Sequence, residues 1–282
     1  MKAVARILTG CLFLLFSAPW AQSGEAENAF RNAVKLQRAG KYKEALAAYD
    51  RAIKADPKSA EAYAGRGSAL AETGLHERAL KDYQEALRLN PNLADAYYLR
   101  GNAHNELKQY GDAVRNYDEA LRRNPKLADA YFNRGMAFYR LGQLEKSLED
   151  FNRAQTLNPK DPEVYSQRGL AQRRLGRHEQ AIADYNEAIK LDPKNAETYN
   201  NRANARSLLG QYGEAVKDYD AAVKLDPKNA RIYANRGAIK LRQRQIDEAR
   251  KDFNRALELD PSLKAKLAPL MALEAPPAGG KR

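Results

Sequence analysis

The side chains that most often carry catalysis or bind metals are scarce in this sequence. It contains three histidines, His76, His104 and His178, and one cysteine, Cys11. The histidines lie far apart, and none has a second histidine or a cysteine at a spacing that would place both on one Zn²⁺ ion. None has a motif that would set it beside a serine nucleophile. These residues predict no metal, no cofactor and no catalytic centre.

Acidic residues are abundant, but those at matching positions have a structural explanation. Glu61, Asp95, Asp129, Glu163 and Glu197 stand where helices are expected to begin. Negative charge at that end of a helix interacts favourably with the helix dipole. An envelope enzyme that works through an unrecognised carboxylate site stays open as an alternative, because no residue is singled out for it.

One arginine recurs at a fixed distance before an acidic or amide residue. We interpret each pair as a tie between two helices, because a guanidinium presents several donors in a rigid fork. The alternative is a ladder of arginines that binds a ligand. The pairs are Arg66 with Asp82, Arg100 with Asn116, Arg134 with Asp150, Arg168 with Asp184, Arg202 with Asp218, and Arg236 with Asp252.

The elements that position these pairs are set by seven prolines spaced 34 residues apart, from Pro57 to Pro261, each preceded by Asp or Asn. A proline lacks the N–H that a helix needs and disfavours the helical conformation of the residue before it. Each one therefore separates two helices. A period of this length predicts an open stack of similar units.

Within each period, small and aromatic residues recur at spacings that place them on one face of a helix. The first half carries Gly or Ala at a fixed place, such as Gly101. The second half carries Ala, or Ser147 in the fourth period, four residues before an aromatic ring, as in Ala113 and Tyr117. The small residues allow two backbones to approach, and the ring fills the space beside them. Each period is therefore predicted to be a helix, a turn and a helix.

This pattern resembles the tetratricopeptide repeat. The resemblance implies an all-α fold, a right-handed superhelical α-solenoid of seven helix-turn-helix repeats, whose inner wall is formed mainly by the first helix of each repeat. It implies no enzyme activity. The arginine is a departure, because the family signature has leucine there. The predicted repeats are 26–59, 60–93, 94–127, 128–161, 162–195, 196–229 and 230–263.

Positions of the first helices that vary between repeats and face the predicted inner wall are candidates for binding. Aromatic rings, a methionine, amides and arginines suit a protein or peptide partner, because rings supply contact area and amides bond its backbone. We therefore predict a scaffold that holds an extended peptide or a partner helix. The predicted groove residues are Tyr98, Asn102, Phe132, Asn133, Met136, Tyr139, Arg140, Arg173, Arg174, Asn200, Asn201 and Asn204.

The two ends of the chain differ from the repeats. Residues 1–23 have the layout of a cleaved secretory signal peptide, with Lys2 and Arg6 before an apolar run, which predicts a periplasmic or secreted protein. An uncleaved signal that anchors the chain to the inner membrane is the alternative. Residues 262–274 are predicted to form a capping helix that Pro269 kinks or ends. Residues 275–282 are predicted to be disordered.

The net charge of +12 is concentrated in the first repeat, the last repeat and the C-terminal segment, and the middle repeats are nearly neutral. A nucleic-acid partner is not expected, because it would need cations along the whole stack. Basic ends suit peripheral contact with an anionic surface, although solvated caps explain them equally well. A module that assembles end to end through its terminal repeats is a further alternative, and the sequence leaves the oligomeric state open.

Overall fold

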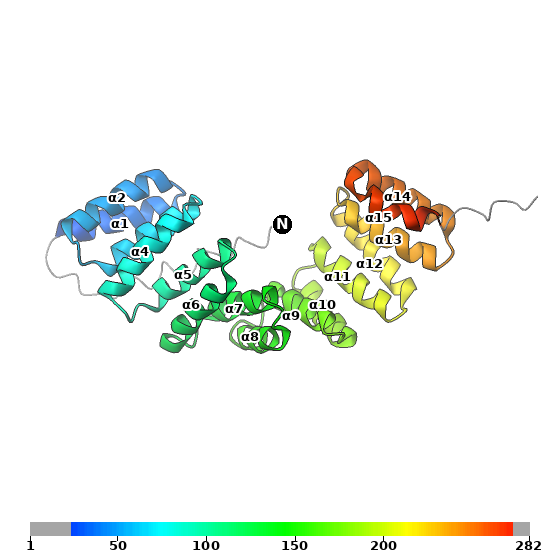
Figure 1. The fold of residues 1–282 in the computed structure, drawn as a ribbon, viewed down its shortest axis with the longest axis horizontal. Helices are drawn as coiled ribbons and strands as arrows, with labels where there is room; N and C mark the ends of the chain where they lie inside the picture. Colours follow the sequence, from blue (N-terminus) through cyan, green and yellow to red (C-terminus); the bar gives the residue numbers. More distant parts are fainter. Residues whose placement is uncertain (1–23, 273–282) are drawn as a thin grey trace, which may run out of the picture. The chain divides into compact units, whose positions relative to one another are not determined.

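The computed structural model describes residues 24–272, and every regular element in that range is a helix. The chain divides into two compact units, one ending at Leu157 and the other beginning at Asn158. Within each unit the helices follow one another as antiparallel hairpins (Figure 1). The predicted all-α fold of consecutive helix pairs is confirmed.

Each helical pair corresponds to one repeat. In the first unit, repeats 1 to 4 are α1 (Gly24–Arg38) with α2 (Tyr42–Ala55), α3 (Ala60–Glu72) with α4 (His76–Leu89), α5 (Ala94–Glu106) with α6 (Tyr110–Arg123), and α7 (Ala128–Arg140) with α8 (Leu144–Leu157). In the second unit, repeats 5 to 7 are α9 (Pro162–Arg174) with α10 (His178–Leu191), α11 (Ala196–Leu208) with α12 (Tyr212–Leu225), and α13 (Ala230–Arg242) with α14 (Ile246–Leu259). The short η2 (Pro261–Leu263) and α15 (Lys264–Ala272) follow.

The Asp or Asn before each proline ends the second helix and starts the turn. In the first repeat, the backbone N–H of Asp56 still donates to the carbonyl of Ala52. The Asp56 carboxylate then accepts the backbone N–H of Lys58 at 3.0 Å. This local bond stabilises a turn in place of another helical residue. The next helix begins after Ser59, whose hydroxyl caps it by accepting from the Ala62 N–H.

In five of the seven hairpins, a glycine of the first helix lies directly under the aromatic ring of the second, and Ala33 and Ala203 stand at this place in repeats 1 and 6. A Cβ added to Gly101 would lie 2.6 Å from the Tyr117 ring, and one added to Gly135 would lie 2.9 Å from Phe151. Both distances are too short for two carbon atoms in contact. The predicted packing of small residues against rings is therefore confirmed, and it fixes how closely the two helices approach.

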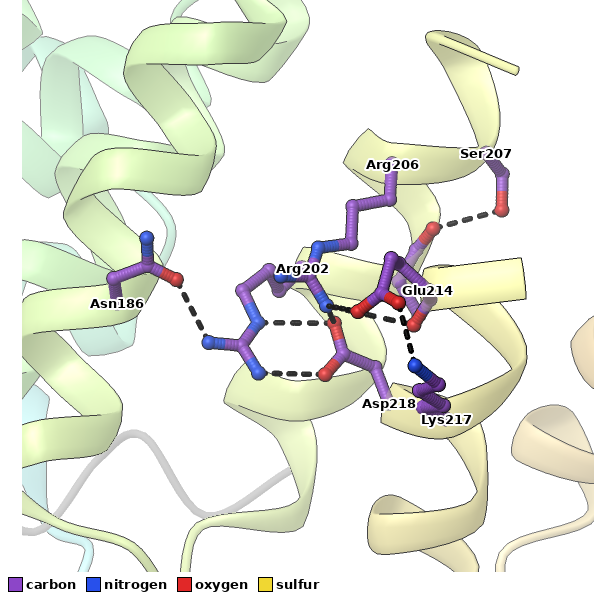
Figure 2. A network of polar contacts seen from close by, with 8 residues as sticks. Asn186, Arg202, Arg206, Ser207, Glu214, Lys217 and Asp218 are labelled. Atoms are coloured by element: carbon purple, nitrogen blue, oxygen red, sulfur yellow. Dashed lines mark hydrogen bonds and ion pairs between the residues drawn. The ribbon is translucent and has the colours of Figure 1, made fainter. Parts of the chain in front are cut away.

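The predicted arginine ties are all present. Five of the six arginines meet an Asp with both Nε and Nη2, at distances of 2.5–2.9 Å. Figure 2 shows the tie of repeat 6, in which Arg202 on α11 faces Asp218 on α12 with both branches of its fork. Its third nitrogen donates to Asn186 on α10 at 2.7 Å. One side chain therefore joins three helices.

The end of the second unit is covered by α15. Leu267 is 1% exposed and packs against the buried Phe253 of α14, with Leu263, Leu270 and Met271 around it. The helix continues through Pro269 to Ala272 and does not end at the proline. A proline there removes only one backbone hydrogen bond in the last turns, and burial of Leu267 holds the helix in place.

None of the helices within 24–272 combines the length and the apolar character of a membrane span. The predicted signal peptide and the predicted disordered tail lie outside the described residues.

Candidate functional site

The first helices of the repeats form a layer of their own within each unit. In the first unit α1 contacts α3, α3 contacts α5, and α5 contacts α7; in the second, α9 contacts α11 and α11 contacts α13. The predicted groove residues of α5 and α7 therefore share one layer, and those of α9 and α11 share another.

The structure separates these residues by depth. Tyr98 and Phe132 are buried at 1% and 4% exposure, because their rings pack against Tyr117 and Phe151 of the second helices, with ring centroids 6.0 and 5.7 Å apart. Asn102 is 5% exposed. These three residues therefore form the base of the surface and are not free to meet a partner directly. The half-buried residues are Asn133, Met136, Tyr139, Arg173, Asn200, Asn201 and Asn204, and Arg140 and Arg174 are exposed.

In the first unit, amides connect the neighbouring helices α5 and α7. Asn133 Nδ2 donates to Tyr98 Oη at 3.1 Å and to Asn102 Oδ1 at 3.0 Å. Asn102 Oδ1 also accepts from the Tyr117 hydroxyl at 2.8 Å. Burial raises the pKa of Tyr117, so its hydroxyl stays protonated and acts as the donor. Asn133 is therefore held in one orientation by a buried network.

The second unit repeats this arrangement with other residues. Asn235 of α13 donates to Asn200 Oδ1 of α11 at 3.1 Å. The Tyr219 hydroxyl donates to Asn204 Oδ1 at 2.7 Å, and burial raises the pKa of Tyr219 to about 12. Asn200 and Asn204 lie one helical turn apart on the same face of α11. Both amides are therefore fixed through their oxygen atoms.

The opposite ends of these fixed amides remain available. Within residues 24–272, Asn133 Oδ1 and the Nδ2 groups of Asn200 and Asn204 have no hydrogen-bond partner. An amide held at one end presents the other at a defined position without a further loss of side-chain entropy. The first unit can therefore accept an N–H through Asn133, and the second unit can separately donate to carbonyl oxygens through Asn200 and Asn204.

Some contributing residues were not predicted from the sequence. The sequence pattern explains the aromatic rings of the second helices by packing alone, whereas the hydroxyls of Tyr117 and Tyr219 also orient amides of the first helices. Asn235 was not among the candidates, although it holds Asn200. The sequence does distinguish these tyrosines from Phe151 and Phe253, which stand at the equivalent places of repeats 4 and 7 and have no hydroxyl. A tyrosine where phenylalanine packs equally well indicates a role for the hydroxyl.

The described residues contain no group of three or more His, Cys, Asp or Glu side chains placed to hold a metal ion. His76 and His178 are the first residues of α4 and α10, and His104 lies on α5 with its Nδ1 2.7 Å from Gln109 Oε1.

Family models identify the repeats. The tetratricopeptide repeat description matches residues 30–94, 76–114, 98–162 and 230–263, and the TPR repeat description matches 172–210 and 203–244. The chain belongs to the tetratricopeptide repeat family. No curated protein sequence matches this tetratricopeptide repeat protein significantly.

Solved structures similar to this tetratricopeptide repeat protein include YrrB, described as "a TPR protein with an unusual peptide-binding site". It is 26% identical, with a TM-score of 0.57 over 64% of this chain and 92% of YrrB. MamA from Desulfovibrio magneticus RS-1 is also 26% identical, with a TM-score of 0.57 over 61% of this chain and 98% of MamA. A tetratricopeptide repeat protein from Parabacteroides merdae, at 21% identity, matches 89% of this chain and 99% of its own with a TM-score of 0.64, which shows the fold alone.

Proposed function

We propose that this protein is a non-catalytic scaffold of the cell envelope that binds an extended peptide or a partner helix through the first helices of its repeats. The observation that carries the proposal is the set of amides fixed at one end and unbonded at the other. Asn133 offers an acceptor, and Asn200 and Asn204 offer donors. The backbone of a bound peptide carries the complementary N–H and C=O groups.

Two further observations support a peptide as the partner. Met136 and Tyr139 lie half-buried on α7, the helix that also carries the fixed Asn133. An adaptable thioether and an aromatic ring beside a polar anchor are typical of peptide-binding surfaces. YrrB, which resembles this chain in fold and sequence, is described as having a peptide-binding site. Location in the envelope rests on the sequence of residues 1–23 alone, and recovery of an uncleaved chain from the cytosol would contradict it.

The proposal can be tested by removing one donor and leaving its support in place. Asn204→Asp keeps Oδ1 as the acceptor for Tyr219 and replaces the free Nδ2 by an oxygen. Peptides selected on the full chain from a random library would be measured against this variant by calorimetry. Loss of the donor and repulsion from carbonyl oxygens should weaken binding about tenfold, which corresponds to one hydrogen bond in a partly buried site.

A matched control adds the same charge elsewhere in the second unit. Asn186 on α10 accepts from Arg202 at 2.7 Å and lies on a second helix. Asn186→Asp should leave peptide affinity unchanged. If both variants bind as tightly as the parent protein, or if no peptide is enriched on the chain, the proposed surface is refuted.

A further inference from the structure

Arg100 in repeat 3 differs from the other tie arginines. Its partner at the place of the buried Asp is Asn116, which accepts from Nε alone at 2.6 Å. Among the described residues, Nη1 and Nη2 of Arg100 have no hydrogen-bond partner. The other five arginines each bond an Asp carboxylate through both Nε and Nη2.

The second carboxylate position near Arg100 is also changed. In repeats 2, 4 and 7, the arginine Nη1 donates to an Asp of the preceding second helix, namely Asp50, Asp118 and Asp220. At the equivalent place before Arg100 stands Gln84, an exposed neutral amide. In repeats 5 and 6 an amide also stands at this second place, Asn152 and Asn186, but the buried Asp is kept. Repeat 3 is therefore the one of the six in which amides occupy both places.

Burial makes the positive charge of Arg100 unfavourable in the absence of an acidic partner. Desolvation lowers the pKa of Arg100, whereas the hydrogen bonds that Arg168 donates to Asp184 raise the pKa of Arg168 at the equivalent place. A further stabilising contact is the face of Tyr97, whose ring centroid lies 5.3 Å from the guanidinium carbon. A half-buried cation without an anion is an unusual arrangement, because its desolvation is only partly offset.

An open pocket of about 620 Å³ lies against this guanidinium. It is lined by α4, α5 and α6, and Arg100, Gln84 and Asn116 all belong to its wall. None of its lining residues is among the predicted groove residues. The pocket therefore gives a group from outside the repeat access to the Arg100 guanidinium.

We infer that this pocket is a binding site for a carboxylate supplied from outside the repeat, such as an Asp or Glu side chain of a partner protein, which pairs with Nη1 and Nη2 of Arg100. The site is additional to the proposed peptide surface. Planar guanidinium and carboxylate groups match in two parallel hydrogen bonds, as they do in the five internal ties.

The other charges of the pocket favour a single negative charge over a multiply charged anion. Its three acidic groups are already paired, Asp112 with Arg115, Asp118 with Arg134, and Glu119 with Arg122 and Arg123. They leave Arg100 as the cation without an acidic partner in the wall. A phosphate dianion would meet these carboxylates at short range, whereas a carboxylate carries only the charge that Arg100 balances.

The inference is tested on the full chain by NMR, through the Nε–Hε resonance of Arg100, which Arg100→Lys identifies by its disappearance. Sodium acetate is the probe, with sodium chloride and sodium phosphate at equal ionic strength as comparisons. Acetate should shift the resonance saturably, and neither comparison salt should do so. A linear response to acetate, or an equal response to chloride or phosphate, would overturn the assignment.

Asn116→Asp closes the site without disturbing the helices, because it gives Arg100 the internal partner of the other repeats. Its acetate affinity should fall at least about tenfold. The reverse variant, Asp82→Asn with Asp50→Gln, gives Arg66 the surroundings of Arg100 and should create an acetate response at Arg66. Unchanged acetate binding in Asn116→Asp would contradict the inference, as would a silent Arg66 in a folded reverse variant.

Discussion

Repeats 3 and 4 stand next to each other in the first unit and have the same helix lengths and the same hairpin, yet they differ in their polar residues. Arg134 of repeat 4 binds Asp150 with two hydrogen bonds, whereas Arg100 of repeat 3 binds a neutral Asn116 with one. Gly142 makes the turn of repeat 4 with φ of +76°, and Lys108 takes the same conformation in repeat 3 with φ of +59°. The comparison shows that the same hairpin forms with different polar residues at the tie and at the turn.

The apolar contact itself also differs between the two repeats. The Tyr117 ring of repeat 3 is held at its hydroxyl by Asn102, while Phe151 of repeat 4 has no hydroxyl. The Tyr117 ring is held by its own Cβ at one end and by this hydrogen bond at the other, so it is less able than Phe151 to move away from a methyl group added beneath it. The response to a small enlargement beneath each ring therefore measures how far the polar anchor stiffens repeat 3.

The largest expected effect is that of Gly101→Ala. The added Cβ would lie 2.6 Å from the anchored Tyr117 ring, so we expect a loss of about 3 kcal/mol in the free energy of unfolding. Gly135→Ala meets the unanchored Phe151 at 2.9 Å and should lose about 2 kcal/mol. Urea denaturation of both variants measures the difference. Equal losses would show that the hydroxyl anchor does not restrain the ring.

A rescue variant tests the same contact. In repeat 1, Ala33 stands at the place of Gly101, and the ring of Tyr49 lies over Gly65 of the next repeat, where a Cβ would be only 2.5 Å away. Asn133 occupies the place of Gly65 beside Tyr117. Asn133→Gly should therefore recover part of the loss caused by Gly101→Ala, which a double-mutant cycle detects as a coupling between the two sites.

Much of this fold could be predicted from the sequence because its signals are local and repeated. The proline spacing, the Gly and aromatic rhythm and the Arg and Asp pairs each appear again in nearly every repeat. The depth of Tyr98 and Phe132 could not be predicted, because it depends on the distance between neighbouring first helices and on the tilt of the rings. The link from Asn133 to Asn102 joins two repeats, and no single repeat contains its pattern.

The exchange of tie partners between repeats 3 and 4 has the next largest expected effect. Asp150→Asn leaves Arg134, whose side chain is 19% exposed, with the exposed Asp118 as its remaining anion. We expect a loss of about 2 kcal/mol in the free energy of unfolding, below the usual loss for a broken buried pair because Asp118 remains. Asn116→Asp should gain about 1 kcal/mol, since Arg100 then acquires a charge-assisted partner.

Thermal and urea unfolding of the two variants give the sign of each change, and hydrogen exchange locates it in α5 and α6 or in α7 and α8. Opposite signs are expected because the first variant removes a carboxylate and the second supplies one. If Asn116→Asp destabilises the protein, Arg100 is already compensated in repeat 3 and the electrostatic difference between the repeats disappears.

The smallest expected effect concerns the turns. A non-glycine residue in the left-handed conformation is disfavoured by about 1 kcal/mol because its Cβ approaches the following carbonyl oxygen. Lys108→Gly removes this strain but gives the unfolded chain more conformational freedom, so we expect a net gain of about 0.5 kcal/mol. Gly142→Lys should lower the free energy of unfolding by a similar amount in repeat 4.

The effect of Gly142→Lys should come from the backbone alone, since no atom lies within 4 Å of a Cβ added to Gly142. Equal stability of Lys108→Gly and the parent protein in urea would contradict this expectation. The turn of repeat 3 would then be held by its backbone hydrogen bonds, whatever residue stands at position 108. These bonds run from Lys108 N to Asn105 O at 2.9 Å and from Gln109 N to His104 O at 2.8 Å.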